Sequence, residues 1–150
     1  MAKLPKDPLV SEIFRAVHGK KTVAQKVDLL KEYKRDDVKA ILIWNFDKGI
    51  ESAVPEGEVH YKKNDSPAGT EGHTRLIHEW RTLYNFVRGG NDKLSNMRRE
   101  TLFMQLLEGL HADEAEIVCL AKDGDLQTKY KITRSVVEQA FGDEINWRDR

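Results

Sequence analysis

Apolar residues recur at intervals of three and four along the first 49 residues, and this spacing predicts helices. The first is indicated by Leu9, Ile13, Phe14 and Val17. We expect Asp7 to cap it, Pro8 to occupy its first turn and Gly19 to end it. Thr22 is a good N-cap for a second helix, whose apolar face is predicted to hold Val23, Val27 and Leu30.

A third helix is predicted to start at Asp36 and Asp37, because acidic residues suit the positive end of a helix dipole. Its apolar positions are Val38, Ile41, Leu42 and Phe46. Gly49 is its expected end, and Trp44 lies off the apolar stripe. The polar, Pro- and Gly-rich stretch 50–73 then predicts a long loop, with a short extended piece at Val59–Tyr61. A tolerated surface insertion explains such a loop more simply than a binding role.

Helical spacing returns after the loop and continues to the end of the chain. A fourth helix is predicted by Leu76, Ile77, Trp80, Leu83, Tyr84 and Val87, with Gly89-Gly90 as its stop. A fifth is predicted from Asp92 or Ser95 to Leu107, with inward residues at Met97, Leu102, Phe103 and Leu106.

The last part of the chain predicts two more helices joined by a polar connection, 124–131. The sixth opens at His111–Asp113 and ends at Gly124, and its apolar residues are Ala115, Ile117, Val118, Leu120 and Ala121. Thr133 is expected to cap the seventh, which ends at Gly142 and carries Val136, Val137, Ala140 and Phe141. The prediction is an all-α fold, a compact bundle of six or seven short helices forming one domain over 1–150.

The composition is that of a water-exposed globular protein, with 33% charged residues and equal numbers, 25 each, of basic and acidic groups. No apolar run reaches the roughly 18–20 residues that span a bilayer, and no secretory signal is recognisable, so we expect a cytoplasmic protein. The single cysteine, Cys119, lies in an apolar helical stretch and is expected to be a buried free thiol.

Motifs for catalysis are missing from the sequence, and we expect neither an enzyme nor a bound cofactor or metal. The five histidines are scattered, and His73 and His78 are five apart, which is the wrong spacing for a metal pair on a helix. Lys122-Asp123-Gly124 lacks the spacing of a nucleotidyltransferase motif and is interpreted as a helix end. No Gly-rich phosphate loop occurs.

Basic residues gather at two predicted helix starts. Lys20 and Lys21 precede the second helix, while Lys129, Lys131 and Arg134 surround the start of the last. Helix N-termini bind phosphate through backbone N–H groups, and neighbouring lysines add charge. The formal net charge of zero counts against a simple nucleic-acid binder, and on local composition alone a solvated polar surface explains these residues better.

The segment from Ala115 to Phe141 carries a resemblance to a known family. An apolar helix leads into Gly124-Asp125-Leu126, and a small helix follows. This order resembles the end of the N-terminal all-helical DNA-binding domain of ATP-dependent DNA ligases, especially those of T-even-type bacteriophages. The likeness covers roughly Leu9 to Trp147 and rests on helix order. Gln127 and Lys129 replace the arginine and second glycine of the broader ligase pattern.

The resemblance implies a non-catalytic, phage-type module that holds double-stranded DNA by its sugar-phosphate backbone without reading sequence. The implied contacts are Lys20, Lys21, Gln127, Thr128, Lys129, Lys131 and Arg134. The rival hypothesis is a protein-interaction factor that keeps the fold and binds a replication or host protein, which the zero net charge and acidic last third favour. A small enzyme is a third hypothesis without a motif to support it.

Overall fold

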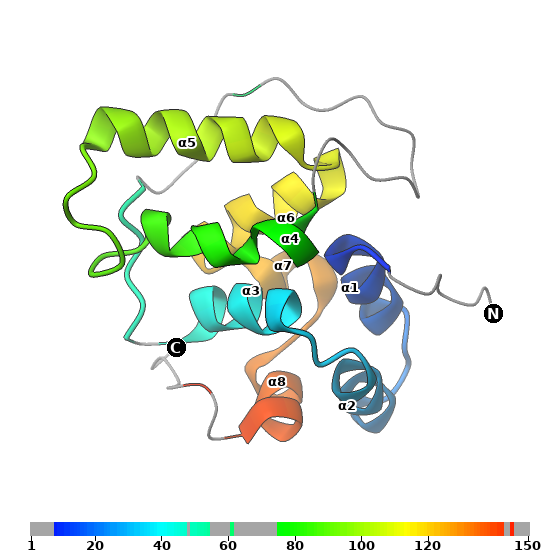
Figure 1. Ribbon diagram of the computed structural model, residues 1–150. Helices are drawn as coiled ribbons and strands as arrows, with labels where there is room; N and C mark the ends of the chain where they lie inside the picture. The colour runs from blue at the N-terminus through cyan, green and yellow to red at the C-terminus, as the bar shows by residue number, and fades with distance from the viewer. Residues whose placement is uncertain (1–7, 48, 55–60, 62–74, 143–144, 146–150) are drawn as a thin grey trace.

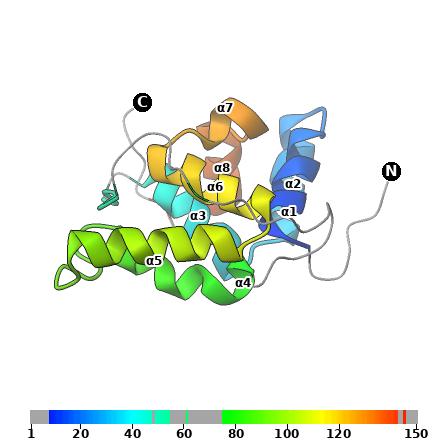
Figure 2. The ribbon, with the colours of Figure 1, turned by 90° about the horizontal axis from the view of Figure 1, so that it is seen from above.

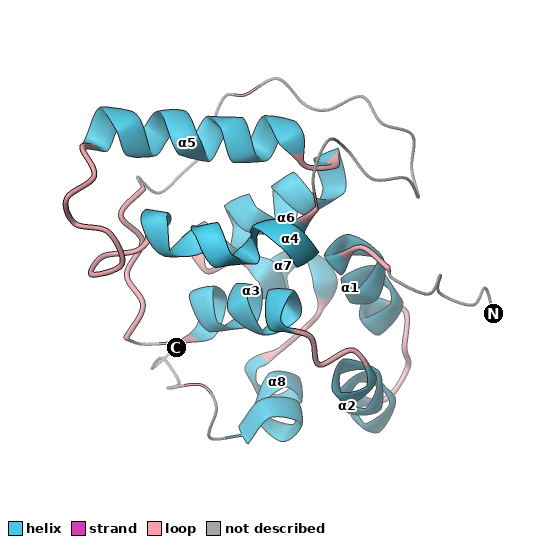
Figure 3. Cartoon of the chain, viewed as in Figure 1, coloured by secondary structure: helices cyan, strands magenta, loops and turns pink. Residues whose placement is uncertain are grey.

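The computed structural model describes residues 8–47, 49–54, 61, 75–142 and 145. Within them the chain forms eight α-helices and one 3₁₀ helix and no strand, so the all-α prediction is confirmed (Figure 3). The elements are α1 (Val10–His18), α2 (Val23–Glu32), α3 (Asp36–Phe46), α4 (Leu76–Glu79), η1 (Trp80–Phe86), α5 (Asn96–Gly109), α6 (Ala112–Asp123), α7 (Leu126–Tyr130) and α8 (Arg134–Phe141).

The helices pack around α3 and α6, which contact each other in the middle of the molecule. Figure 1 shows α5 and α4 on one side of this pair and α2 and α8 on the other, and the view in Figure 2 agrees. Side chains from all of these elements join one apolar cluster. Its largest fully buried members include Phe14, Leu30, Ile41, Leu42, Phe103, Leu107, Ile117 and Leu126.

The predicted hydroxyl caps are present in the structure. The Oγ1 atom of Thr22 accepts from the Gln25 N–H at 3.2 Å, and Thr133 caps α8 in the same way. Of the two starts expected for the fifth helix, Asp92 and Ser95, the structure has Ser95, which caps α5. Gly124 ends α6 with a φ of 72°, a left-handed conformation that favours glycine. Thr22, Thr133 and Gly124 therefore mark helix boundaries as predicted.

Helix α1 starts later than predicted. Its first residue is Val10, and Leu9, which has no side-chain acceptor, occupies the N-cap position. The carboxylate of Glu12 accepts the Leu9 N–H at 2.9 Å in place of a capping side chain. Pro8 precedes the helix, and the expected cap Asp7 lies outside the described residues.

Two residues predicted to face inward are exposed: Val23 stands in the first turn of α2, before its packed face begins, and Met97 lies on the same face of α5 as the exposed Met104. Val23 is 46% exposed and Met97 is 80% exposed. The buried residue near the start of α5 is instead Arg99, whose guanidinium donates to the backbone oxygens of Asn85, Asn91 and Leu94 and to the Asn96 side chain. A buried cation with this many acceptors fastens the preceding turn onto α5.

The predicted fourth helix is divided into α4 and the 3₁₀ helix η1. Buried Leu83 and Phe86 are three apart, which fits the three residues per turn of a 3₁₀ helix. Tyr84 is 52% exposed as a result. Trp44, placed off the apolar stripe, is buried, since its indole N–H donates to the Ser52 hydroxyl at 2.7 Å.

The polar connection predicted over 124–131 contains a helix, α7, which raises the number of α-helices above the six or seven expected. Leu126 and Tyr130 are four apart and both buried, so they form its inward face. Three polar residues separate Leu126 from Tyr130, so the sequence pattern shows no clear helical signal there. Most of the predicted loop 50–73, including Val59 and His60, lies outside the described residues.

Glu114 on α6 joins the starts of two other helices from inside the core. Its side chain is 1% exposed, and its two carboxylate oxygens accept the N–H of Val10 at 3.0 Å and that of Leu76 at 3.2 Å. These are the first residues of α1 and α4. Helix N-termini carry unpaired N–H groups and partial positive charge, so one carboxylate stabilises both. Burial is the main influence on Glu114 and raises its pKa, although the two backbone hydrogen bonds act in the opposite direction.

We expect Glu114→Ala to lower the free energy of unfolding by about 2–4 kcal/mol, because two buried N–H groups lose their acceptor. Glu114→Gln keeps one acceptor and should cost less.

Since folding raises the Glu114 pKa above 4.5, the contribution of Glu114 to stability is greatest below that value and falls as pH rises through the folded pKa. Urea unfolding at pH 5 and pH 8 should therefore show the wild-type advantage over Glu114→Gln shrinking at the higher pH.

The control for this series is Glu100→Ala, which removes an exposed acid from α5. It should change the free energy of unfolding by less than about 0.5 kcal/mol. Equal effects of the Glu114 and Glu100 substitutions would show that the buried carboxylate does not hold α1 and α4.

Candidate DNA-binding surface

Helices α2 and α8 lie side by side and point in the same direction. Near their starts, the Lys26 ammonium donates to the Lys131 carbonyl at 3.1 Å. Near their ends, the Lys34 ammonium lies 5.3 Å from the centroid of the Phe141 ring. The two helices therefore place their N-termini, each capped by a threonine, at one edge of the molecule.

This shared edge has the properties of an anion site. A helix N-terminus offers N–H groups without intrahelical partners and a partial positive charge. Two such ends that face the same way reinforce each other's field for one phosphate-bearing ligand. Both helices are long enough, with 10 residues in α2 and 8 in α8, to have a defined axis.

Four of the predicted contact residues surround this edge. Lys20 and Lys21 precede α2, Lys131 precedes the cap of α8, and Arg134 is its first residue. Lys21 and Lys131 are exposed, and Arg134 makes a long 3.8 Å contact with Glu138 one turn along the helix. We refer to these four residues, with Lys26, as the basic edge.

Lys26 belongs to the basic edge although sequence reasoning missed it. It lies 105 positions before Lys131, and its hydrogen bond to the Lys131 carbonyl holds the start of α8 against α2. Its place in the sequence, four residues after the Thr22 cap and next to the apolar face that holds Val23 and Leu30, does not indicate this contact.

Gln127 points into the protein. Its Oε1 atom accepts from the Asn45 side chain at 3.1 Å, and its Nε2 atom donates to the Gly124 carbonyl at 2.8 Å. The side chain is half-buried and its amide is used at both ends. This geometry gives Gln127 a structural role, and its predicted contact with phosphate stays a prediction.

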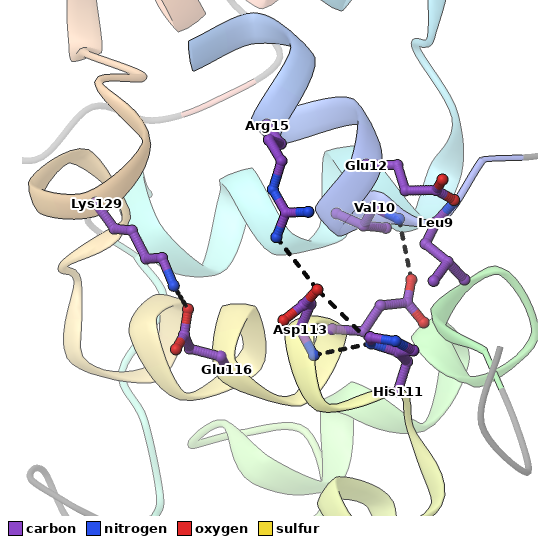
Figure 4. Close-up of polar contacts among 9 residues, drawn as sticks. Leu9, Val10, Glu12, Arg15, His111, Asp113, Glu116 and Lys129 are labelled. Carbon is purple, nitrogen blue, oxygen red and sulfur yellow. Dashed lines mark hydrogen bonds and ion pairs between the residues drawn. The ribbon is translucent and has the colours of Figure 1, made fainter. Parts of the chain in front are cut away.

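Thr128 and Lys129 lie on the exposed side of α7. The Thr128 hydroxyl donates to the Asp125 carbonyl at 2.6 Å, which leaves its oxygen at the surface. The Lys129 ammonium forms an ion pair with Glu116 of α6 (Figure 4). Lys129 is therefore close to the basic edge in sequence but is neutralised by an acid in the unbound protein.

Asn45 positions α7 and was also missed from the sequence. It is 2% exposed, its Oδ1 atom accepts the Leu126 N–H at 3.1 Å, and its Nδ2 atom donates to Gln127. The first turn of α7 is thus tied to α3 by one buried amide. Nothing in the local sequence distinguishes a buried asparagine of this kind from an exposed one.

A second surface lies on the opposite side of the molecule, between η1 and α5. It contains a hollow of about 300 Å³ lined by Glu79, Thr82, Asn85, Phe86, Leu102, Gln105 and Leu106. Met97 and Met104, seven residues apart on α5, are 80% and 38% exposed. Two exposed methionines on one helix face provide an adaptable apolar surface.

The described residues include the side-chain types that bind metals and one thiol, Cys119. No group of three or more His, Cys, Asp or Glu residues there is arranged to hold a metal ion. Cys119 is half-buried, less so than expected, and burial raises its pKa to about 11, so the thiol stays protonated at neutral pH. No described helix is long and apolar enough to cross a membrane.

Residues 13–128 match a protein family described as Family of unknown function (DUF6433). The chain belongs to this family. The match includes Lys20, Lys21 and Lys26 and ends before Lys129, so the part of the basic edge on α8 lies beyond it. A search of curated proteins found no match to the chain. The description of the family states no activity, and the likeness to DNA ligases stays a prediction.

We expect Asn45→Ala to lower the free energy of unfolding by about 1–3 kcal/mol, because the buried Leu126 N–H and the Gln127 amide each lose a partner. Urea unfolding at neutral pH measures this change. Gln139→Ala, which removes a surface amide from α8, is the matched control and should have little effect. An Asn45 variant as stable as the control would contradict the role assigned to Asn45.

Proposed function

We propose that this protein is a non-catalytic module that binds duplex DNA through the sugar-phosphate backbone. The observation that carries the proposal is the shared edge of α2 and α8, where two helix N-termini meet basic residues from separate segments. The resemblance to the DNA-binding domain of ligases, drawn from the order of the helices, supports the same function. An accessory role in phage DNA replication or repair would follow from that resemblance.

The expected recognition is independent of base sequence. N–H groups at helix starts and lysine ammonium groups are suited to phosphate oxygens, and contacts to phosphate carry no sequence information. Phosphate contacts position a protein on DNA while the affinity depends on counterion release. A module with few such contacts and zero net charge should bind moderately, with a salt dependence set by the small number of phosphate contacts.

The first test is fluorescence anisotropy of a labelled nicked duplex at 50 and 150 mM salt. With about three phosphate contacts, we expect the wild-type affinity to fall roughly 10- to 20-fold over this range. The triple variant Lys21→Ala, Lys131→Ala, Arg134→Ala should lose most of the binding at low salt and show a shallower salt dependence.

The matched control removes three exposed basic residues from the other side of the molecule, Arg81, Lys93 and Arg98. It has the same net charge as the first triple variant and should keep most of the affinity. Equal losses in the two variants would indicate attraction to charge alone without a defined surface. Absence of wild-type binding at 50 mM salt would refute the proposed function.

A second candidate function is a protein-interaction factor that binds a replication or host protein. The specific observation in its favour is the exposed pair Met97 and Met104, which share one face of α5. If this surface binds a partner, Met97→Ser with Met104→Ser should weaken capture of a defined replication or host protein at least tenfold, with little effect of salt. Capture that is unchanged in this variant would argue against this surface.

A further inference from the structure

Two ion pairs join α6 to its neighbours next to the basic edge, one to α1 and one to α7. Asp113 and Glu116 are three residues apart and therefore project from the same face of α6. The Arg15 guanidinium of α1 lies 3.2 Å from the Asp113 carboxylate, and Lys129 of α7 pairs with Glu116. Figure 4 shows both cations reaching toward α6, from α1 and α7 respectively. We call these four residues the α6 ion-pair cluster.

Both ion pairs are open to solvent. The side chain of Arg15 is 61% exposed and that of Lys129 is 47% exposed, and the two acids are 35% and 42% exposed. Exposed ion pairs contribute little to stability because water screens them. A competing anion can therefore replace either carboxylate at low cost.

Tyr130 supplies an independent sign of a missing ligand. The residue is 3% exposed, its ring packs against Phe14 at a centroid distance of 6.0 Å, and its buried hydroxyl has no hydrogen-bond partner among the described residues. The Lys129 ammonium lies 5.6 Å from the centroid of this ring. Buried hydroxyl groups are almost always paired, so an unpaired one needs an explanation.

The Tyr130 hydroxyl also lies within the electrostatic influence of the α6 ion-pair cluster. Burial raises its pKa to about 12, and the charges that act on it are those of Glu116, Arg15 and Asp113. The hydroxyl is therefore protonated at neutral pH and available as a donor. Arg15 of α1 and Lys129 of α7 thus pair with acids one turn apart on α6, and Lys129 also lies against the Tyr130 ring. Cations and a hydroxyl donor are the groups that bind phosphate.

We propose that Arg15, Lys129 and the Tyr130 hydroxyl form a second phosphate subsite, and that Asp113 and Glu116 occupy its cations in the unbound protein. This inference rests on the proposed function and extends the contact surface from the basic edge onto α1. On binding, a backbone phosphate of the duplex takes the place of the two carboxylates, and movement of Lys129 off the tyrosine ring opens the hydroxyl to the phosphate oxygen. The acids on α6 thus act as internal competitors that lower the affinity for DNA.

The first test removes the competitors. In the anisotropy assay, Asp113→Asn and Glu116→Gln should each raise the affinity for the nicked duplex at 50 mM salt by roughly twofold to fivefold. Glu100→Gln makes the same charge change on the exposed face of α5 and should have a smaller effect. If the affinity for the duplex rises no more in these variants than in Glu100→Gln, the proposed second subsite is wrong.

The second test separates ligand contact from folding. Tyr130→Phe removes a hydroxyl that has no partner in the described part of the chain, so the melting temperature should stay the same or rise, while the affinity for DNA should fall roughly twofold to tenfold. Arg15→Gln should weaken binding without unfolding the protein. If Tyr130→Phe binds DNA with wild-type affinity, the Tyr130 hydroxyl is not part of the phosphate subsite.

The failure of this inference differs from a failure of the proposed function. If the wild type binds and the Lys21, Lys131 and Arg134 substitutions abolish binding, while the α6 and Tyr130 variants behave as their controls, the basic edge stands and the second subsite is wrong. If no variant binds DNA at 50 mM salt, both are wrong.

Discussion

The arrangement of this helical bundle depends on one buried carboxylate. Glu114 accepts the first N–H groups of both α1 and α4 from within α6, a contact that joins segments 104 and 38 residues away. Burial raises the pKa of Glu114 because the charged carboxylate loses its contact with water. The hydrogen bonds from the N-termini of α1 and α4 offset part of that free-energy cost. Because α1 also carries Arg15, the same contact sets where one side of the candidate surface lies relative to α6.

The candidate surface follows from how α2, α7 and α8 are held around this frame. Asn45 ties α7 to α3, and the Lys26–Lys131 hydrogen bond ties α8 to α2. Two capped helix starts then share one edge, and basic side chains surround it although the whole chain has no net charge. Acids on α6 and α8 neutralise part of this field, so any affinity for phosphate depends on local geometry and on exchange of ion pairs.

Local signals predicted much of the helical framework. Thr22, Thr133 and Gly124 act as the expected caps, because each depends on interactions within a few residues. Predictions failed where a distant partner decided the outcome. Helix α7 was missed because its two apolar residues, Leu126 and Tyr130, form an inward face only when other segments provide a core for them. Periodicity alone cannot show such partners.

The amino-acid pattern was sufficient to specify an all-α chain and to place basic residues at the starts of the second and last helices, since helix periods and capping residues are local properties. Packing decided that α2 and α8 run parallel, that Gln127 turns inward, and that Lys26 and Arg15 lie near residues about 100 positions away. Contacts of this range depend on how the helices share one core, and side-chain burial there is set by the neighbours that other segments provide.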